Sequence, residues 1–269
     1  MSAGTVVLVG CGQMGAAMLR GWLASDAAQH FVVVEPAGTP PALAASPLVS
    51  AHRAADEIAS DLAPGAVVFA IKPQVFDEIV PAYRRFARPG TVFMSIAAGK
   101  TIAGLAGHLG EAAIVRVMPN TPAAVGRAIS VACANAQVSA AQRQLCEGLL
   151  AAIGESAWIV DEALMDAVTA VSGSGPAYVF LLIETLAAAG AKAGLPANLA
   201  LRLAKATVAG SGELARQSSE LPAKLRENVT SPGGTTRAAL DVLMGDGGLA
   251  ALMVEAVAAA TRRSRELAS

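Results

Sequence analysis

"VVLVGCGQMGAAM", residues 6–18, is the stretch that decides the fold of this 269-residue chain. An apolar run suited to a buried strand is followed at once by Gly10, Gly12 and Gly15 and then by a helix-like run. Glycines at this spacing predict a dinucleotide-binding loop. The first makes the tight turn, the second lets a pyrophosphate approach the backbone, and the third lets helix and strand pack closely. We therefore expect a Rossmann-type α/β domain.

An acidic residue stands where such a domain meets the ribose of its dinucleotide. Glu35 follows Gly15 by 20 residues and ends the second predicted strand. A carboxylate at this place accepts hydrogen bonds from ribose hydroxyls and repels a 2′-phosphate, which favours NADH. Arg53 follows the next short apolar run and could reach a phosphate, although a solvated surface arginine is the simpler interpretation. The choice between NADPH and NADH stays open, with a slight preference for NADH.

Short β-rich runs alternate with helical runs through the first 160 residues, which predicts a doubly wound sheet. Runs suited to buried strands cover 5–9, 31–35, 66–70, 92–96 and 113–117, with further strands at 129–133 and 156–160. Helices are predicted at 13–25, 54–59, 75–86 and 102–109. A capping box of Ser139 and Gln142 opens another helix, which Gly154 ends.

Two more loops follow strands at the same expected edge of this sheet. They are AIKPQ at residues 70–74 and SIAAG at residues 95–99. Ligands of doubly wound sheets lie beyond the carboxyl ends of the strands, so both loops should face the nicotinamide half of the cofactor. Lys72 is the only charged residue in either loop, and a surface lysine is an equally good interpretation of it.

After Asp161 the strand-like runs cease and long helical stretches follow. These are predicted at 176–192, at 196–216 and from residue 249 to the basic residues near the C-terminus. We therefore expect two domains. The first is an N-terminal α/β Rossmann (doubly wound) domain at residues 1–160, and the second is an all-helical domain at residues 161–269.

Composition argues against several kinds of partner. Hydrophobic residues make up 54% of the chain, charged residues 15%, and the net charge is −1. This disfavours nucleic acid and anionic membrane surfaces and suggests apolar surface buried between subunits. The uncharged run at 167–183 is too short, and too interrupted by Gly and Pro, to span a bilayer. Three cysteines without CxxC spacing indicate the reducing cytoplasm, and no ligand cluster suggests a metal.

The stretch NVTSPGGTTRAAL, residues 228–240, is suited to holding an anion. Between Asn228 and Arg237 it has no ionisable side chain, but hydroxyls and backbone N–H groups are dense where the chain enters a helix-like run. The first N–H groups of a helix lack partners and attract anions. An ordinary cap with Thr235 as the N-cap is the other interpretation, and the two are compatible.

Six segments together resemble one family. GCGQMG, AIKPQ, SIAAGKTI, RVMPNTPAAVG, AVSGSGPAYVF and NVTSPGGTTRAAL occur in the order and rough spacing of pyrroline-5-carboxylate reductases, over essentially the whole chain. The resemblance implies NADPH- or NADH-dependent reduction of the cyclic imine 1-pyrroline-5-carboxylate to L-proline, the last step of proline biosynthesis. It also implies a Rossmann domain, an all-helical dimerisation domain, and a homodimer at minimum or a higher ring of dimers.

The resemblance also assigns roles to residues. Thr236 is expected to be catalytic, because its hydroxyl orients the ring nitrogen of the substrate. The expected substrate-binding residues are Glu162, Ser231, Gly234, Thr235 and Thr236. The expected cofactor-binding residues are Gly10, Cys11, Gly12, Gln13, Met14, Gly15, Glu35, Arg53, Ala70, Ile71, Lys72, Pro73, Ala97, Ala98 and Asn228. Two residues depart from the pattern, since Glu35 replaces a small polar residue of NADPH-using members and Arg237 replaces an apolar one.

Two other functions fit part of the sequence. A β-hydroxyacid dehydrogenase shares the plan of a Rossmann domain followed by helices, but it needs a lysine base on the first long helix of the second domain. Residues 176–191 contain no lysine, and Lys192 falls only at the helix end. An inactive dinucleotide-sensing protein is the second alternative, against which the intact Thr235–Thr236 pair argues.

Overall fold

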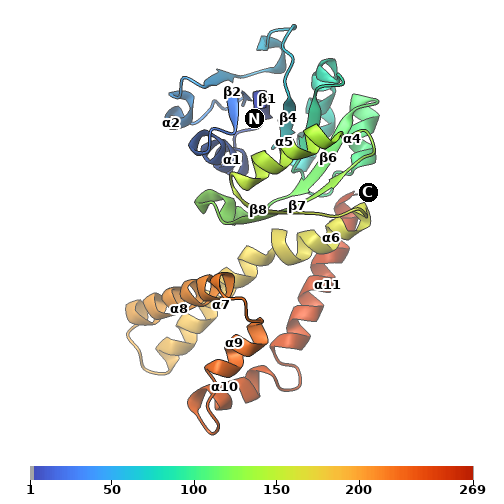
Figure 1. The fold of residues 1–269 in the computed structure, drawn as a ribbon. Coiled ribbons are helices and arrows are strands. Elements are labelled where there is room, and N and C mark those ends of the chain that lie inside the picture. Colours follow the sequence, from blue (N-terminus) through green and yellow to red (C-terminus); the bar gives the residue numbers. More distant parts are fainter. Residues whose placement is uncertain (1–2, 269) are drawn as a thin grey trace. The chain divides into compact units, whose positions relative to one another are not determined.

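The computed structural model describes residues 3–268, which form two compact units (Figure 1). One unit runs through Gly173 and includes the chain again from Ala260, and the other spans Ser174–Ala259. The first unit contains all eight strands. These are β1 (Ala3–Val9), β2 (Ala28–Val34), β3 (Val49–His52), β4 (Ala66–Phe69), β5 (Val92–Ser95), β6 (Ala113–Met118), β7 (Ala128–Ala134) and β8 (Gly154–Trp158).

The strands form one sheet in the order β3-β2-β1-β4-β5-β6-β7-β8, which confirms the predicted doubly wound architecture. Neighbouring strands are parallel, except for the antiparallel pair β6 and β7. The connection between these two, residues 119–127, is shorter than the dozen or more residues that a parallel crossover needs. The chain turns from one side of β1 to the other between β3 and β4, which is where such sheets bind ligands.

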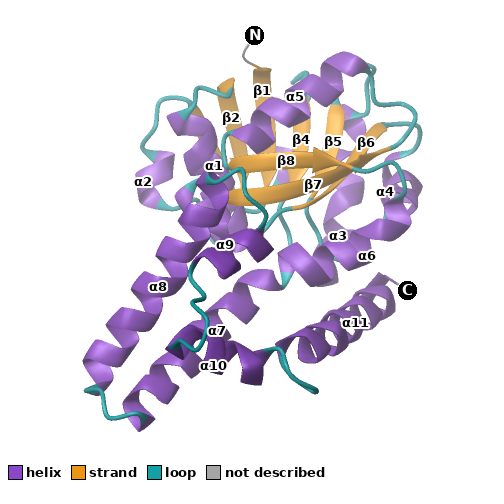
Figure 2. Cartoon of the chain, turned by 60° about the horizontal axis from the view of Figure 1, so that its bottom comes forward, coloured by secondary structure: helices purple, strands orange, loops and turns teal. Residues whose placement is uncertain are grey.

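The core lies on both faces of this sheet. Side chains of β1 alternate between two clusters, with Val6 and Leu8 packed in the same cluster as Trp22 and with Val7 and Val9 in the other. All residues of β4, β5 and β6 are buried, as expected for strands covered on two sides. Figure 2 shows helices on both sides of the orange sheet.

Five helices of the first unit accompany the strands: α1 (Gln13–Ala24), α2 (Pro41–Ala44), α3 (Phe76–Ile79), α4 (Ile102–Leu109) and α5 (Ala140–Ala151). Helix α1 is held by Trp22, whose ring stacks on Phe31 and whose Nε1 donates to the carbonyl of Leu149 at 2.8 Å. The predicted capping box of α5 is confirmed, because Ser139 and Gln142 exchange hydrogen bonds.

Several local predictions were wrong. Strand β3 was not predicted, and the expected helix at 54–59 is only the 3₁₀ turn η1 (Ala55–Glu57). The expected helix at 75–86 is divided into η2 (Pro73–Val75), α3 and η3 (Val80–Phe86). Pro81 interrupts it, because proline lacks the N–H that a regular helix interior requires. Another 3₁₀ turn, η4 (Thr121–Val125), lies between β6 and β7.

No strand follows β8 in the described chain, as predicted. Its later elements are η5 (Glu162–Leu164), α6 (Met165–Val168), the π-helical η6 (Thr169–Gly173), α7 (Gly175–Lys192), α8 (Ala197–Gln217), α9 (Pro222–Asn228), α10 (Thr235–Leu243) and α11 (Leu249–Ala268). The three long predicted helices correspond to α7, α8 and α11. Helix α9 was not predicted, although Pro222 at its first position is a common start signal.

The compact units divide at Gly173, later than the change from strands to helices. Residues before Gly173 pack with the first unit, since Met165 is fully buried and Asp166 accepts a 2.6 Å hydrogen bond from Ser264. The boundary of the two functional domains at residue 161 remains a prediction.

The helical stretch Glu162–Lys192 is longer than the sequence suggested. It runs for 31 residues, and its length and composition would suffice to cross a membrane. The uncharged run at 167–183 appeared too short because the helix continues into charged residues at both ends. A single stretch of this kind is a weak indication of a membrane span, since apolar helices that pack against protein pass the same test.

Candidate active site

The glycine loop after β1 has the geometry that its sequence predicts. Gly10 has a φ of +91°, and a Cβ there would meet the carbonyl oxygen of Ala70 at 2.5 Å. At Gly15 a Cβ would meet the carbonyl oxygen of Gly10 at 2.3 Å. Gly12 differs, because nothing lies within 4 Å of a Cβ built on it. Two glycines thus permit close packing, and the middle one borders open space that a phosphate can occupy.

The N-terminus of α1 is left uncapped by side chains. Gly12 is its N-cap, no side chain accepts from the first turn, and no acidic residue lies in that turn. The first N–H groups of a helix have no acceptor inside it and stand at the positive end of its dipole. The loop and this helix end therefore fit a pyrophosphate.

Glu35 lies beside this loop and is held by two backbone donors. The N–H of Cys11 donates to Oε2 at 2.7 Å, and the N–H of Ala37 donates to Oε1 at 3.1 Å. Burial, and secondarily the charge of Glu35, raise the pKa of the Cys11 thiol to about 11. The thiol is therefore protonated at neutral pH, which argues against cysteine chemistry here.

A cavity of about 590 Å³ opens between the carboxyl ends of β1, β2 and β4. Seven of the predicted cofactor residues line it: Gly10, Gly12, Glu35, Arg53, Ala70, Ile71 and Lys72. Seven others of the first unit do not line it: Cys11, Gln13, Met14, Gly15, Pro73, Ala97 and Ala98. The cavity therefore matches the predicted ribose side of the site.

The loop after β5 forms a second part of the same sheet edge. The hydroxyl of Ser95 accepts a 3.2 Å hydrogen bond from the N–H of Ala97, which is buried. Ala98 packs against the small cluster of Met118, Cys133 and Met165. This hydrogen bond and this packing contact hold the backbone of the loop at the edge where the nicotinamide is expected.

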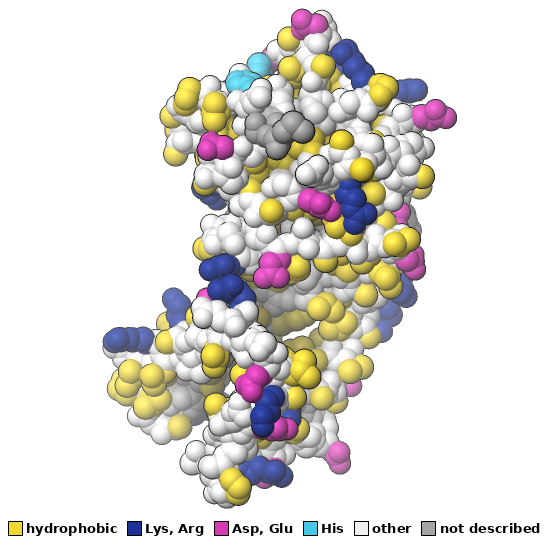
Figure 3. Space-filling model, viewed as in Figure 1, with side chains coloured by type: hydrophobic (Ala, Val, Ile, Leu, Met, Phe, Trp, Pro, Cys, Tyr) yellow, Lys and Arg dark blue, Asp and Glu magenta, His cyan; other side chains and the backbone are white. Residues whose placement is uncertain are grey.

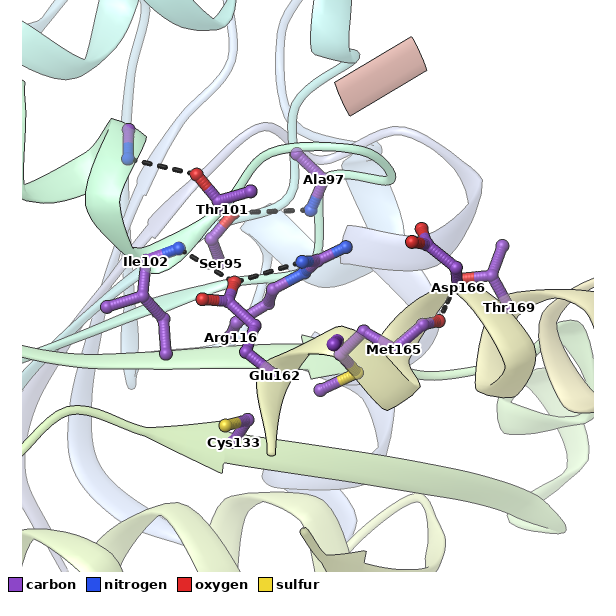
Figure 4. Close-up of polar contacts among 12 residues, drawn as sticks. Ser95, Ala97, Thr101, Ile102, Arg116, Cys133, Glu162, Met165, Asp166 and Thr169 are labelled. Atoms are coloured by element: carbon purple, nitrogen blue, oxygen red, sulfur yellow. Dashed lines mark hydrogen bonds and ion pairs between the residues drawn. The ribbon is translucent and has the colours of Figure 1, made fainter. Parts of the chain in front are cut away.

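Glu162 is engaged by two donors at this edge, as Figure 4 shows. Its Oε1 accepts a 2.9 Å hydrogen bond from the N–H of Ile102, the first residue of α4, and another of 2.9 Å from Nη1 of Arg116. Sequence reasoning missed Arg116. The available signal was a single arginine within the otherwise apolar run of β6.

The remaining predicted residues lie in the second unit, on the segment that leads into α10. Gly234 is the N-cap of α10, and a Cβ there would meet the hydroxyl oxygen of Ser231 at 2.3 Å. The interpretation of Thr235 as the N-cap is therefore wrong. Thr235 and Thr236 are the first two helical residues, and no side chain caps this helix end. An uncapped helix end of this kind can accommodate an anion, and the anion site here stays a prediction.

Several polar side chains lie along this segment. A hollow of about 330 Å³ is lined by Thr230, Ser231, Pro232, Gly233 and Arg237. Nδ2 of Asn228 donates to Oε2 of Glu220 at 3.0 Å. Arg237, unexplained by the sequence, forms a 2.8 Å ion pair with Asp241 one turn along α10. The predicted site residues thus form two groups, one in each compact unit. No cluster of metal-ligating side chains occurs within residues 3–268.

Family models match both parts of the chain. One described as pyrroline-5-carboxylate reductase dimerisation matches residues 162–267. Another, described as NADP oxidoreductase, coenzyme F420-dependent, matches residues 5–99.

Relatives match the chain over its full length. It is 40% identical to the pyrroline-5-carboxylate reductase of Pseudomonas aeruginosa over 100% of this chain and 98% of the relative. It is 37% identical to that of Pisum sativum over 98% of this chain and 96% of the relative. The solved structure of the Coxiella burnetii pyrroline-5-carboxylate reductase matches with a TM-score of 0.90 at 30% identity, covering 98% of both chains. The Plasmodium falciparum enzyme with NADP bound matches with a TM-score of 0.84 at 29% identity, also covering 98% of both.

The fold and the glycine loop define a dinucleotide-dependent oxidoreductase with a helical second domain. The chain belongs to the pyrroline-5-carboxylate reductase family.

Proposed function

We propose that this protein reduces 1-pyrroline-5-carboxylate to L-proline with NADH or NADPH, the last step of proline biosynthesis. The observation that carries this proposal is the full-length similarity to the Pseudomonas aeruginosa enzyme, at 40% identity. The open space at Gly12 suits the pyrophosphate of the cofactor, and the uncapped N-terminus of α10 suits the substrate carboxylate.

The first domain binds the cofactor. Gly10, Gly12 and the N-terminus of α1 hold the pyrophosphate, and Glu35 with Arg53 borders the ribose in the 590 Å³ cavity. The remaining proposed contacts of this domain are Cys11, Gln13, Met14, Gly15, Ala70, Ile71, Lys72, Pro73, Ala97 and Ala98. Asn228, at the end of α9, is a proposed cofactor contact of the second domain. The bound nicotinamide supplies the hydride. The residues of this chain contribute by orienting the nicotinamide, and no acid–base step is assigned to them.

The second domain binds the substrate carboxylate. The N–H groups and hydroxyls of Ser231, Gly234 and Thr235 accommodate it, because the N-terminus of α10 is positive and uncapped. The hydroxyl of Thr236 accepts a hydrogen bond from the ring N–H of the protonated imine. A protonated imine accepts hydride directly, so no strong acid is required. Glu162, in the first unit, is the other proposed substrate contact.

Glu35 favours NADH over NADPH. Both of its oxygens are oriented by backbone donors, which leaves a fixed negative charge at the cavity wall. A 2′-phosphate at that wall would meet like charge, which raises the free energy of binding. Arg53 lines the same cavity and offsets part of this repulsion.

The helical domain is an oligomerisation domain, as the matching family model indicates. Within the second unit, large apolar side chains of α7 are exposed, among them Val179, Phe180, Leu181 and Leu182. Figure 3 shows hydrophobic side chains on the outer surface of this part of the chain. We assign this surface to a homodimer at minimum, with a ring of dimers as the larger form. The enzyme acts in the cytoplasm, away from membranes and nucleic acid.

One assay tests the function. The protein is mixed with NADH or NADPH and racemic pyrroline-5-carboxylate, and absorbance at the nicotinamide band is followed. Loss of absorbance with the imine supports the proposal. Loss only with a 2-keto or semialdehyde acid would indicate a hydroxyacid dehydrogenase, and no loss with any substrate would indicate a binding protein.

A further inference from the structure

Arg116 is the one buried charged residue within residues 3–268, with 4% of its surface exposed. Its guanidinium is only partly satisfied. Nη1 donates to Glu162 at 2.9 Å, whereas Nη2 is buried without an acceptor among the described residues. A buried donor without a partner is destabilising, and a buried ion pair is often no more stable than an apolar pair of similar volume. Stability alone therefore does not account for an arginine at this position.

The position of Arg116 connects it to the expected nicotinamide edge. On β6 it pairs in register with Ser95 of β5 on one side and with Cys133 of β7 on the other. Ser95 accepts the hydrogen bond from Ala97 that fixes the loop after β5. Arg116 therefore lies beside the strand end that carries the proposed cofactor contacts Ala97 and Ala98.

The bonds of Glu162 are unevenly distributed between its two oxygens. Oε1 accepts from both Ile102 and Arg116, while Oε2 has no partner among the described residues. The Glu162 side chain is 28% exposed, against 5% for that of Arg116. One oxygen is thus anchored to β6 and to the start of α4, and the other is left available to a ligand. Figure 4 shows the two side chains pointing toward one another between these elements.

We propose that Arg116 is a positioning residue for hydride transfer, which anchors Glu162 through Oε1 so that Oε2 meets the cationic ring of the bound imine. The inference rests on the proposed function. Arg116 acts through Glu162 and contacts neither the substrate nor the dinucleotide. Without it, the Ile102 N–H alone retains the carboxylate, which then rotates away from the geometry that the iminium requires. The effect falls on turnover, because the pyrophosphate loop and Glu35 lie on other strands.

The experiment compares Arg116→Met, Arg116→Lys, Glu162→Gln and the Arg116→Met/Glu162→Gln double variant. Glu162→Gln keeps an oxygen that accepts from Ile102 but removes the charge. Arg143→Met is the matched control, since Arg143 also lies in the first unit, where it stacks on Trp158 and pairs with Glu147 rather than with Glu162. Four quantities are measured: kcat and KM for pyrroline-5-carboxylate, the Kd of NADH from its fluorescence without substrate, and the thermal midpoint.

Arg116→Met should lower kcat roughly tenfold to 100-fold, the range for one charge-assisted hydrogen bond, while the Kd of NADH changes less than about threefold. Arg116→Lys should recover part of kcat, because it keeps the charge but not the fork geometry. The double variant should be no slower than Glu162→Gln alone, because Arg116 and Glu162 serve the same function and the second change has nothing further to remove. Arg143→Met should match wild type in kcat.

Four results would overturn the inference. If the losses of kcat in the two single variants multiply in the double variant, Arg116 acts independently of Glu162. A parallel fall of kcat, NADH affinity and thermal midpoint would show a purely structural role. If Arg116→Met does not fold, Arg116→Lys decides, and an unchanged kcat in a stable lysine variant contradicts the proposal. An inactive wild type contradicts the proposed function itself, whereas an active wild type with unaffected variants contradicts only the role of Arg116.

Discussion

The backbone N–H of Cys11 donates a 2.7 Å hydrogen bond to Oε2 of Glu35, which ties the acidic side chain after β2 to the glycine loop after β1. The carboxylate is therefore held at the wall of the cavity that Gly10 and Gly12 also line. A negative charge fixed at this place is the basis of the expected cofactor preference.

Glu35→Ser should raise the use of NADPH relative to NADH, because it removes the charge that repels a 2′-phosphate. The measurement is the ratio of kcat/KM for the two cofactors in wild type and variant. Glu155→Ser, which alters an exposed residue of β8, is the control and should leave the ratio unchanged. An unaltered ratio in Glu35→Ser would mean that Glu35 does not border the ribose of the bound cofactor.

Alanine substitutions at Gly12 and Gly15 should have opposite consequences. A Cβ at Gly12 meets nothing within 4 Å, so Gly12→Ala should fold with nearly wild-type stability and yet bind NADH at least about tenfold more weakly. A Cβ at Gly15 lies 2.3 Å from the Gly10 carbonyl oxygen, so Gly15→Ala should lose about 1–3 kcal/mol of stability. Thermal unfolding and NADH fluorescence titration distinguish the two. Equal stability loss at both positions would contradict the assigned roles.

These local features could be predicted from the sequence because they depend on residues close together in the chain. The glycine loop and the capping box of Ser139 and Gln142 each follow from spacing and backbone chemistry. The alternation of runs was also sufficient for the doubly wound sheet. Resemblance to a family supplied the proposed roles of Thr236 and Glu162, which spacing alone does not give.

Features that depend on distant residues could not be predicted. The Arg116–Glu162 pair joins residues 46 positions apart, and nothing in either local sequence specifies the partner. The direction of β7 depends on the length of its connection rather than on its own residues. Two local features were also predicted wrongly. Pro81 divided an expected helix, although the apolar pattern around it was helical. Thr235 was wrongly assigned as the N-cap because Gly234 can serve without a side chain.

Thr236→Val should lower kcat/KM for pyrroline-5-carboxylate on the order of 10- to 100-fold. Valine keeps the β-branched shape but lacks the hydroxyl, whose hydrogen bond to a charged ring N–H contributes roughly 1.5–3 kcal/mol. The Kd of NADH should barely change, and stability should shift by about 1 kcal/mol or less, because no side chain caps α10. Full efficiency in this variant would assign the ring nitrogen to another residue, and Glu162 would be tested next.

The protein should be a homodimer or larger at micromolar concentration. Exposed apolar side chains on α7, including Phe180 at 57% exposure, need a partner surface. Phe180→Glu should weaken association. Val125→Glu should not, because Val125 is an exposed apolar residue of the first unit. Light scattering measures both. A wild-type monomer would contradict the assignment of this surface to an interface.

The most direct test of the central claim follows the hydride itself. Wild-type protein is incubated with pyrroline-5-carboxylate and NADH that carries deuterium at both C4 positions of the nicotinamide, and the product is analysed by mass spectrometry. The account predicts proline that is one mass unit heavier, with the deuterium on the former imine carbon, formed in equal amount to the NADH consumed. Consumption of the cofactor without labelled proline, or no consumption at all, would contradict it.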